Sequence, residues 1–267
     1  MNLLQKIISC VLVFSLCRPP LKAQESSVFK AHNVYIIIHG TWSCGTSWAN
    51  AGGDFFDALE KNAPEGSAIL PYTWSGSVDH ASREHAAKGL VKLIKSYPPK
   101  TNIHIIAHSH GANVATVAAQ ILAKDPNNHH FITDFYALGA PVNMSSYSPA
   151  MDVIGSLYNL FSFEDFVQPV FGFFERIYPE HPRIANFRIF LNGKEPGHSE
   201  LHDPLVGQLI PHLPAFLYAN KCPLSAPGII YLTQNSLPVY KTDTDRERLL
   251  QRDKQMIQLL ATSLAPQ

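Results

Sequence analysis

The chain has 267 residues, of which 46% are hydrophobic and 16% are charged, and its 21 Lys and Arg residues balance its 21 Asp and Glu residues. This composition is typical of a globular protein and excludes a disordered or fibrous one. The lack of a basic excess argues against a nucleic-acid partner, because binding to phosphates requires clustered Lys and Arg. A chain of this length can bury about three quarters of its unfolded surface within one α/β domain.

Residues 1–23 resemble a secretory signal peptide. Lys6 precedes the short apolar run 7–16, and two prolines end that run before Ala23. The run is shorter than the roughly 20 residues that a membrane-spanning helix needs. We therefore expect an exported protein, secreted or periplasmic, that is cleaved near Ala23 and forms a single domain over residues 24–267. An uncleaved anchor at the membrane interface is the alternative.

Removal of that segment leaves two cysteines, Cys44 and Cys222. Exported proteins form disulfides in an oxidising compartment, but the two Cα atoms must lie within about 7 Å of each other. The sequence does not decide whether these two cysteines are bridged.

The pattern of apolar residues predicts strands that alternate with helices. The predicted strands are 34–38, 68–72, 103–107, 131–138, 156–161 and 187–191, and the predicted helices are 54–61, 79–97, 111–124 and 246–264. Such alternation indicates βαβ units and a mostly parallel sheet. Reactive residues in these sheets gather at the carboxyl ends of the strands. The segment 222–240, which contains several Pro and Gly residues, has no assignment.

Ser109 lies at the centre of Ala107-His108-Ser109-His110-Gly111, between the predicted strand 103–107 and the next helix. Small residues two before and two after a serine allow a tight turn that exposes its hydroxyl at the end of a sheet. This position predicts a nucleophile, with the backbone amide of His110 as a donor to the developing oxyanion. A serine that only caps the helix is the alternative.

A second oxyanion donor is expected from the residues after the first strand, His39-Gly40-Thr41-Trp42. Glycine lets the backbone turn across the end of the sheet there, so that the amide of Thr41 or Trp42 can point toward the serine. His39 belongs to this turn and precedes the serine. It is therefore expected to be a structural hydrogen-bonding residue and not the catalytic base.

The acid and the base are expected on loops after later strands. Asp165 follows the strand 156–161, with Glu164 as the near alternative, and it could instead cap a helix. His198 follows the strand 187–191, which is expected to be the last strand, with His202 as the alternative. A carboxylate that accepts the Nδ1–H of the base would fix its tautomer.

In these features the chain resembles the lipase- and esterase-like group of the α/β-hydrolase superfamily. The matching residues lie within about residues 33–215, and they are His39-Gly40-Thr41-Trp42, Trp74-Ser75-Gly76 with Arg83, Ala107–Gly111, Asp165 and Gly197-His198-Ser199. The resemblance implies the α/β-hydrolase fold, a mostly parallel central sheet flanked by helices on both faces. It also implies a catalytic triad of Ser109, Asp165 and His198 in the chain order that the superfamily uses.

The implied activity is that of a secreted serine hydrolase that cleaves carboxylic esters, with lipid esters among the candidates, through an acyl-enzyme. Neither a cofactor nor a metal is expected, because the histidines lack metal-ligand spacing. The expected partner is a small-molecule or lipid ester, with transient contact to a membrane surface as a further option. An acyltransferase, a thioesterase or a non-catalytic binding protein on the same scaffold is the alternative. The oligomeric state is not set by the sequence.

The aromatic segment 161–178 begins at the end of the predicted strand 156–161 and carries six phenylalanines and a tyrosine. It could line an acyl pocket or form a lid over the site. Ordinary core packing is the alternative.

Overall fold

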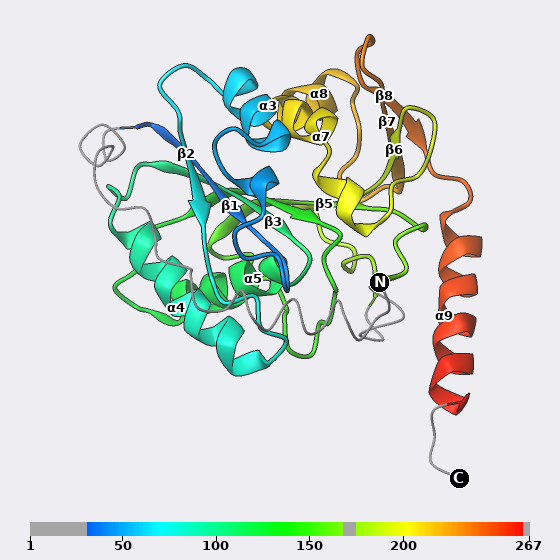
Figure 1. Ribbon diagram of the computed structural model, residues 1–267, viewed down its shortest axis with the longest axis horizontal. Coiled ribbons are helices and arrows are strands. Elements are labelled where there is room, and N and C mark those ends of the chain that lie inside the picture. Colours follow the sequence, from blue (N-terminus) through cyan, green and yellow to red (C-terminus); the bar gives the residue numbers. More distant parts are fainter. Residues whose placement is uncertain (1–30, 168–174, 264–267) are drawn as a thin grey trace.

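The computed structural model describes residues 31–167 and 175–263. Within them, eight strands form one sheet in the order β2-β1-β3-β4-β5-β6-β7-β8 (Figure 1). The strands are β1 (Asn33–Ile38), β2 (Ala68–Tyr72), β3 (Asn102–His108), β4 (Ile132–Leu138), β5 (Ile154–Phe161), β6 (Ile184–Leu191), β7 (Gly228–Leu232) and β8 (Val239–Thr242). Neighbouring strands are parallel except β7 and β8, which are antiparallel. The predicted leader, residues 1–23, lies outside the described residues.

Helices cover both faces of this sheet, so the predicted fold class is confirmed. The helical elements are η2 (Ser47–Ala49), α3 (Asp54–Asn62), α4 (His80–Lys95), α5 (His110–Lys124), η3 (His198–His202), α7 (Pro204–Leu209), η4 (Ile210–His212), α8 (Leu213–Ala219) and α9 (Arg246–Ser263). Helices α4 and α5 pack on one face, and α3, α7 and α8 pack on the other (Figure 1). None of the described helices is both long and apolar enough to cross a bilayer.

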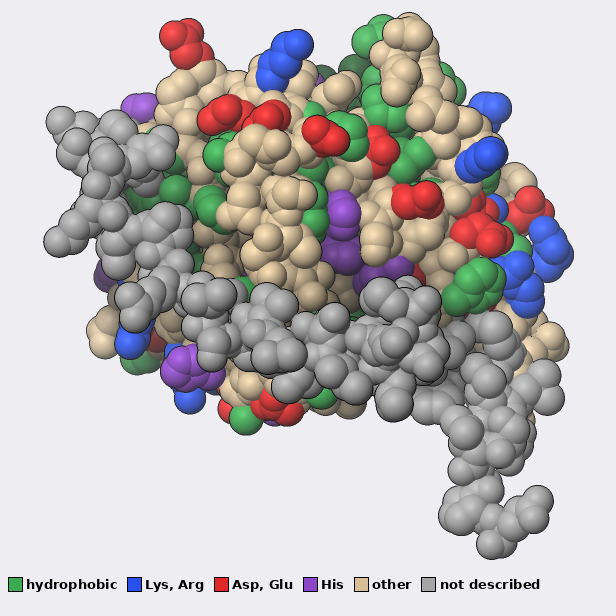
Figure 2. Space-filling view, viewed as in Figure 1, with side chains coloured by type: hydrophobic (Ala, Val, Ile, Leu, Met, Phe, Trp, Pro, Cys, Tyr) green, Lys and Arg blue, Asp and Glu red, His purple; other side chains and the backbone are tan. Residues whose placement is uncertain are grey.

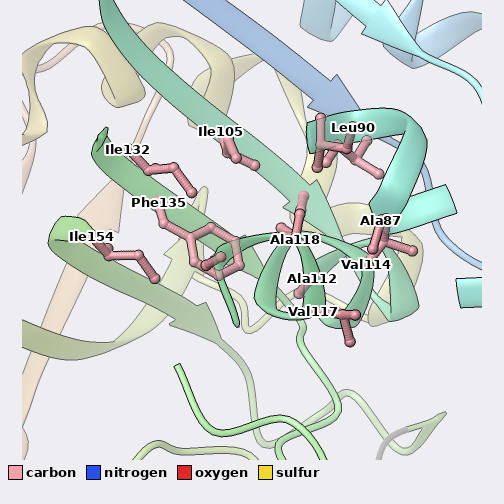
Figure 3. Close-up of a cluster of buried hydrophobic side chains, with 14 of the residues drawn as sticks. Ala87, Leu90, Ile105, Ala112, Val114, Val117, Ala118, Ile132, Phe135 and Ile154 are labelled. Atoms are coloured by element: carbon pink, nitrogen blue, oxygen red, sulfur yellow. The ribbon is translucent and has the colours of Figure 1, made fainter. Parts of the chain in front are cut away.

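Small side chains on α5 let this helix approach the sheet closely. Figure 3 shows Ala112 and Ala118 of α5 among the side chains of Ile105 and Phe135 from the sheet, with Leu90 of α4 beside them. All five are fully buried. Because α5 begins directly after β3, this packing also fixes the position of the turn between the two elements.

The C-terminal part of the sheet corrects the prediction of where the last strand lies. The strand 187–191, expected to be the last, is followed by β7 and β8, which begin within the unassigned segment 222–240. Strand β7 has a short apolar run that directly follows Pro227 and Gly228, and β8 is a mostly exposed edge strand of four residues. His198 therefore follows β6, and two further described strands come after it in the chain.

The structure shows whether Cys44 and Cys222 are bridged to each other. Cys222 has a free thiol, so no disulfide joins it to Cys44. Burial raises the pKa of the Cys222 thiol.

The aromatic segment 161–178 is only partly described. Phe161, Phe163 and Tyr178 are buried, whereas Phe166 is exposed. The three phenylalanines at 171, 173 and 174 lie outside the described residues. The described part includes core residues, and a lid or pocket role for the segment stays a prediction.

Candidate active site

Ser109 lies on a sharp turn between β3 and α5. Its backbone has φ 54° and ψ −132°, a conformation that costs a non-glycine residue roughly 1–3 kcal/mol and is found mainly at functional sites. The turn is held because the Ser109 amide donates to Leu138 O at 2.9 Å and Ser109 O accepts from the Ala112 amide at 2.9 Å. The side chain makes no capping hydrogen bond to α5. The hydroxyl is therefore not a helix cap.

The small residue two positions after the serine is required by close packing. A Cβ atom placed on Gly111 would lie 2.7 Å from the carbonyl oxygens of both Ile38 and His39. Such a separation is well inside van der Waals contact. The turn can therefore pack against the end of β1 only with glycine at this position.

Of the three predicted oxyanion donors, Trp42 is engaged elsewhere. The Trp42 amide donates to Gly76 O at 3.0 Å, so it is not directed at Ser109. Among the described residues the Thr41 amide has no backbone acceptor. His110 is the first residue of α5, and the first amides of a helix point out of its N-terminus toward groups outside the helix. A Cβ on Gly40 would lie 2.8 Å from Ser109 Cβ, which places this loop directly beside the serine.

His39 is a structural residue, as its position in the turn predicts. Its Nδ1–H donates to Gly40 O at 2.8 Å, and its Nε2 accepts from the Trp74 amide at 3.3 Å. The Trp74 indole donates to His39 O at 2.7 Å. Burial lowers the pKa of His39, which keeps the imidazole neutral in this role. His39 thus binds the loop after β1 to the loop after β2.

Asp165 and His198 form the hydrogen bond that an acid–base pair requires. His198 Nδ1 lies 2.7 Å from Asp165 Oδ2, and Asp165 is fully buried. The carboxylate fixes the imidazole with a proton on Nδ1, so Nε2 is the free proton acceptor. Glu164 is exposed and makes no side-chain contact with His198 among the described residues. Of the two predicted acids, only Asp165 is bonded to His198.

Gly139, directly after β4, makes room for this pair. Its φ is 58°, in the left-handed region that favours glycine. A Cβ there would lie 3.1 Å from Asp165 Oδ2 and 3.4 Å from His198 Nδ1. Because the preceding Leu138 also accepts the Ser109 amide, the end of β4 connects the serine turn to the Asp165–His198 pair.

Histidine side chains gather in the middle of one face of the molecule (Figure 2). The ring of His108 lies 4.6 Å from that of His198 and 5.1 Å from that of His202, and His202 stacks on Trp48 at 4.3 Å. His108 Nε2 donates to His198 O at 2.9 Å. His108 therefore holds the backbone that carries His198, while His202 packs against the cluster and is not bonded to Asp165.

The neighbours of His198 stay uncharged near neutral pH. Burial, with the charges of the other histidines, lowers the pKa of His108 well below its usual value. Burial also lowers the pKa of His110 and that of His202, each to about 4. The site therefore contains one imidazole that is paired with a carboxylate and three that resist protonation.

This cluster predicts a loss of stability in acid. Between pH 6.5 and 4, His202 is protonated in the unfolded chain but stays neutral in the native protein. The free energy of unfolding therefore falls as the pH falls through this range. The expected contribution of His202 is on the order of 2 kcal/mol. Urea unfolding at pH 7 and at pH 4.5 measures this effect. A His202→Phe variant keeps the stacking on Trp48, and its free energy of unfolding should decrease less between pH 7 and pH 4.5 than that of the wild type. A His129→Phe change at an exposed position should leave the pH dependence of the free energy of unfolding unaltered. The same pH dependence in the wild type and in both variants would contradict the prediction.

Glu195 links the loop of the acid to the loop of the base. It lies between β6 and His198, and its carboxylate accepts the Phe163 amide at 2.8 Å. Arg188 of β6 forms a partly buried ion pair with the same carboxylate. The two loops are therefore held in one arrangement by a side chain that belongs to neither reacting group.

Arg176 holds the acid loop from the other side. Its Nη1 donates to Ser162 O at 2.8 Å and to Asp165 O, and its Nε is paired with Asp253 of α9. Both Arg176 and Asp253 are buried. The C-terminal helix is thus connected to the backbone of Asp165 through one buried ion pair.

These supporting residues were not found from the sequence. Glu195 had a weak local signal, because it lies in the same loop as His198. Arg176 and Asp253 are 77 positions apart, and no local pattern connects them. Among the described residues no group of three His, Cys, Asp or Glu side chains is arranged to hold a metal ion.

A family model for lipase (class 3) matches residues 35–172, which is more than half of the chain. The chain belongs to the class 3 lipase family. The match begins within β1, includes the serine turn and Asp165, and ends before His198. As a member, the protein is a lipase- or esterase-like hydrolase of the α/β-hydrolase superfamily, and the predicted fold and family resemblance are confirmed.

Three solved structures are among those to which the chain is similar. An α/β-superfamily hydrolase from Xanthomonas campestris pv. campestris has 11% identity and a TM-score of 0.42, covering 69% of this chain and 99% of its own. A cutinase-like protein from Cryptococcus sp. has 14% identity and a TM-score of 0.43, covering 73% and 96%. The thioesterase RedJ from Streptomyces coelicolor has 12% identity and a TM-score of 0.35, covering 94% of each chain. No match to a curated protein is found.

Proposed function

We propose that this class 3 lipase relative is an exported serine hydrolase that cleaves carboxylic esters with Ser109, His198 and Asp165. The observation that carries the proposal is the buried Asp165–His198 hydrogen bond of 2.7 Å at the same edge of the sheet as the strained turn of Ser109. An imidazole paired with a carboxylate and a serine on a strained turn are the components that nucleophilic acyl transfer requires. The leader-like pattern of residues 1–23 supports export.

In this mechanism Ser109 Oγ attacks the ester carbonyl while His198 Nε2 accepts the hydroxyl proton. The amides of His110 and Thr41 donate to the oxyanion of the tetrahedral intermediate. His198 then gives its proton to the leaving alcohol, and the acyl group stays on Ser109. Water attacks the acyl-enzyme with His198 again as the base, which releases the acid and restores the serine.

The residues around this edge of the sheet favour an apolar substrate. Trp42, Val78 and Phe166 are 68%, 57% and 45% exposed, and they lie on the loops after β1, β2 and β5. Exposed large apolar side chains that gather on one side of a molecule usually mark a binding site. They support an ester with an apolar acyl group, presented in part by a lipid surface.

Labelling with a fluorophosphonate probe tests the proposal. We expect the folded wild-type protein to form a covalent adduct that mass spectrometry maps to Ser109, because only an activated serine attacks this phosphorus centre. Ser109→Ala should not be labelled, whereas Ser145→Ala, at an exposed serine, should react like the wild type. An unlabelled wild type, or an adduct at another residue, would favour the binding-protein alternative. A series of p-nitrophenyl esters of increasing acyl length then defines the substrate.

A further inference from the structure

Arg83 is a buried cation that has no acidic partner among the described residues. It lies in the first turn of α4 and is 7% exposed. Its Nε donates to the Tyr147 hydroxyl at 2.8 Å, and its Nη1 donates to Val78 O at 2.7 Å. Both partners are neutral. No carboxylate among the described residues forms an ion pair with Arg83, and its Nη2 donates no hydrogen bond to them.

A guanidinium that is removed from water is ordinarily paired, because an uncompensated buried charge is costly. Two carboxylates near Arg83 in sequence are engaged elsewhere. Asp79 caps α4 and accepts hydrogen bonds from Ser77 and Ser82. Glu84 lies 3.3 Å from His80 Nε2. The fold therefore maintains a fixed positive charge at a point where none of the acidic side chains in the described part of the chain neutralises it.

This charge lies at the edge of the sheet that carries the reacting residues. Helix α4 begins there because it follows the parallel strand β2, and the two groups that hold Arg83 belong to the loops after β2 and β4. The guanidinium also acts on the residue next to the nucleophile. Burial is the larger cause of the lowered pKa of His110, and the positive charge of Arg83 lowers that pKa further.

We infer that Arg83 is an anion-binding subsite of the active site, which takes an anionic group carried by the ester substrate. The unused N–H groups of a guanidinium match a carboxylate or phosphate in charge and in planar geometry. The Tyr147 and Val78 contacts orient the side chain in advance, so little freedom is lost on binding. The inference rests on the proposed ester hydrolysis and adds a preference for substrates that carry a negative charge near the scissile bond.

The test compares charged and neutral esters of the same shape. For an anion on the acyl side, mono-p-nitrophenyl succinate is paired with p-nitrophenyl 4-methylpentanoate. For an anion on the alcohol side, 4-butyryloxybenzoate is paired with its methyl ester. The wild type should cleave one of the two charged esters with a kcat/KM at least about tenfold above that of its neutral partner, since a charge-assisted hydrogen bond contributes about 1.5–3 kcal/mol. The pair that shows the preference identifies which side of the ester faces Arg83.

Two variants separate charge recognition from structural support. Arg83→Met should reduce kcat/KM for the preferred charged ester by about 10- to 100-fold, mainly through KM, and leave the neutral ester within about threefold. Tyr147→Phe removes one support of Arg83 but keeps its charge, and it should retain the preference. Equal losses on charged and neutral esters in Arg83→Met, or no charge preference in the wild type, would overturn the subsite while leaving the proposed hydrolase intact. A wild type that cleaves none of the four esters would overturn both.

Discussion

A Ser109→Ala variant is expected to lose between about 10³- and 10⁶-fold in kcat for ester hydrolysis, because the change removes the nucleophile. The activity that remains would come from substrate binding and the oxyanion donors, which the change leaves in place. Stability should be almost unaltered. The Ser109 hydroxyl does not cap α5, and alanine carries the same Cβ, so the strain of the turn stays as it is. Steady-state kinetics with a p-nitrophenyl ester, together with thermal unfolding, measures both quantities.

The same experiment tests whether Ser109 and His198 act as one unit. His198→Ala should cause a loss comparable to that of Ser109→Ala, and the double variant should be no slower than the worse single variant. If the two losses multiplied, each residue would act independently, and the shared mechanism would be wrong. Full activity in Ser109→Ala would exclude this serine as the nucleophile. An exposed serine, Ser145, provides the matched substitution that should have no effect.

Much of the fold could be predicted because the central strands are buried on both faces. The apolar run of β1 is continuous in the sequence, that of β3 is interrupted only by His104, and both strands are almost fully buried in the structure. The signal is short in β7, which has four consecutive apolar residues after Gly228, and it is lacking in β8. Strand β8 has mostly exposed residues because it is the edge of the sheet, and its pairing with β7 depends on contacts that a local pattern does not contain.

The candidate catalytic residues could be proposed from the sequence for a related reason. Ser109, Asp165 and His198 each follow a strand, and parallel strands bring their carboxyl ends to one edge. What orients these residues was not predictable. The engagement of the Trp42 amide by Gly76 depends on the approach of two loops. The choice of Asp165 over Glu164 likewise depends on the path of the backbone after β5 and not on residue type.

Removing the connection between α9 and the loop that carries Asp165 is expected to lower both stability and activity. Asp253→Ala is expected to lower the free energy of unfolding by about 3–5 kcal/mol, because it leaves the buried guanidinium of Arg176 without its carboxylate on α9. It should also lower kcat measured on the folded protein, since Arg176 donates to the backbone of Asp165 and a loosened Asp165 no longer fixes the tautomer of His198.

The matched control lies on the same helix. Glu247→Ala removes an exposed carboxylate in the first turn of α9 and should change stability by less than about 1 kcal/mol. Asp253→Asn keeps an oxygen that can accept from Arg176 Nε, so its kcat should lie between those of Asp253→Ala and the wild type. Urea unfolding and kinetics at a temperature where every variant is folded distinguish two outcomes. A stability loss with unchanged kcat would limit α9 to a structural role, whereas a loss in both would make the Arg176–Asp253 pair a positioning element for the catalytic acid.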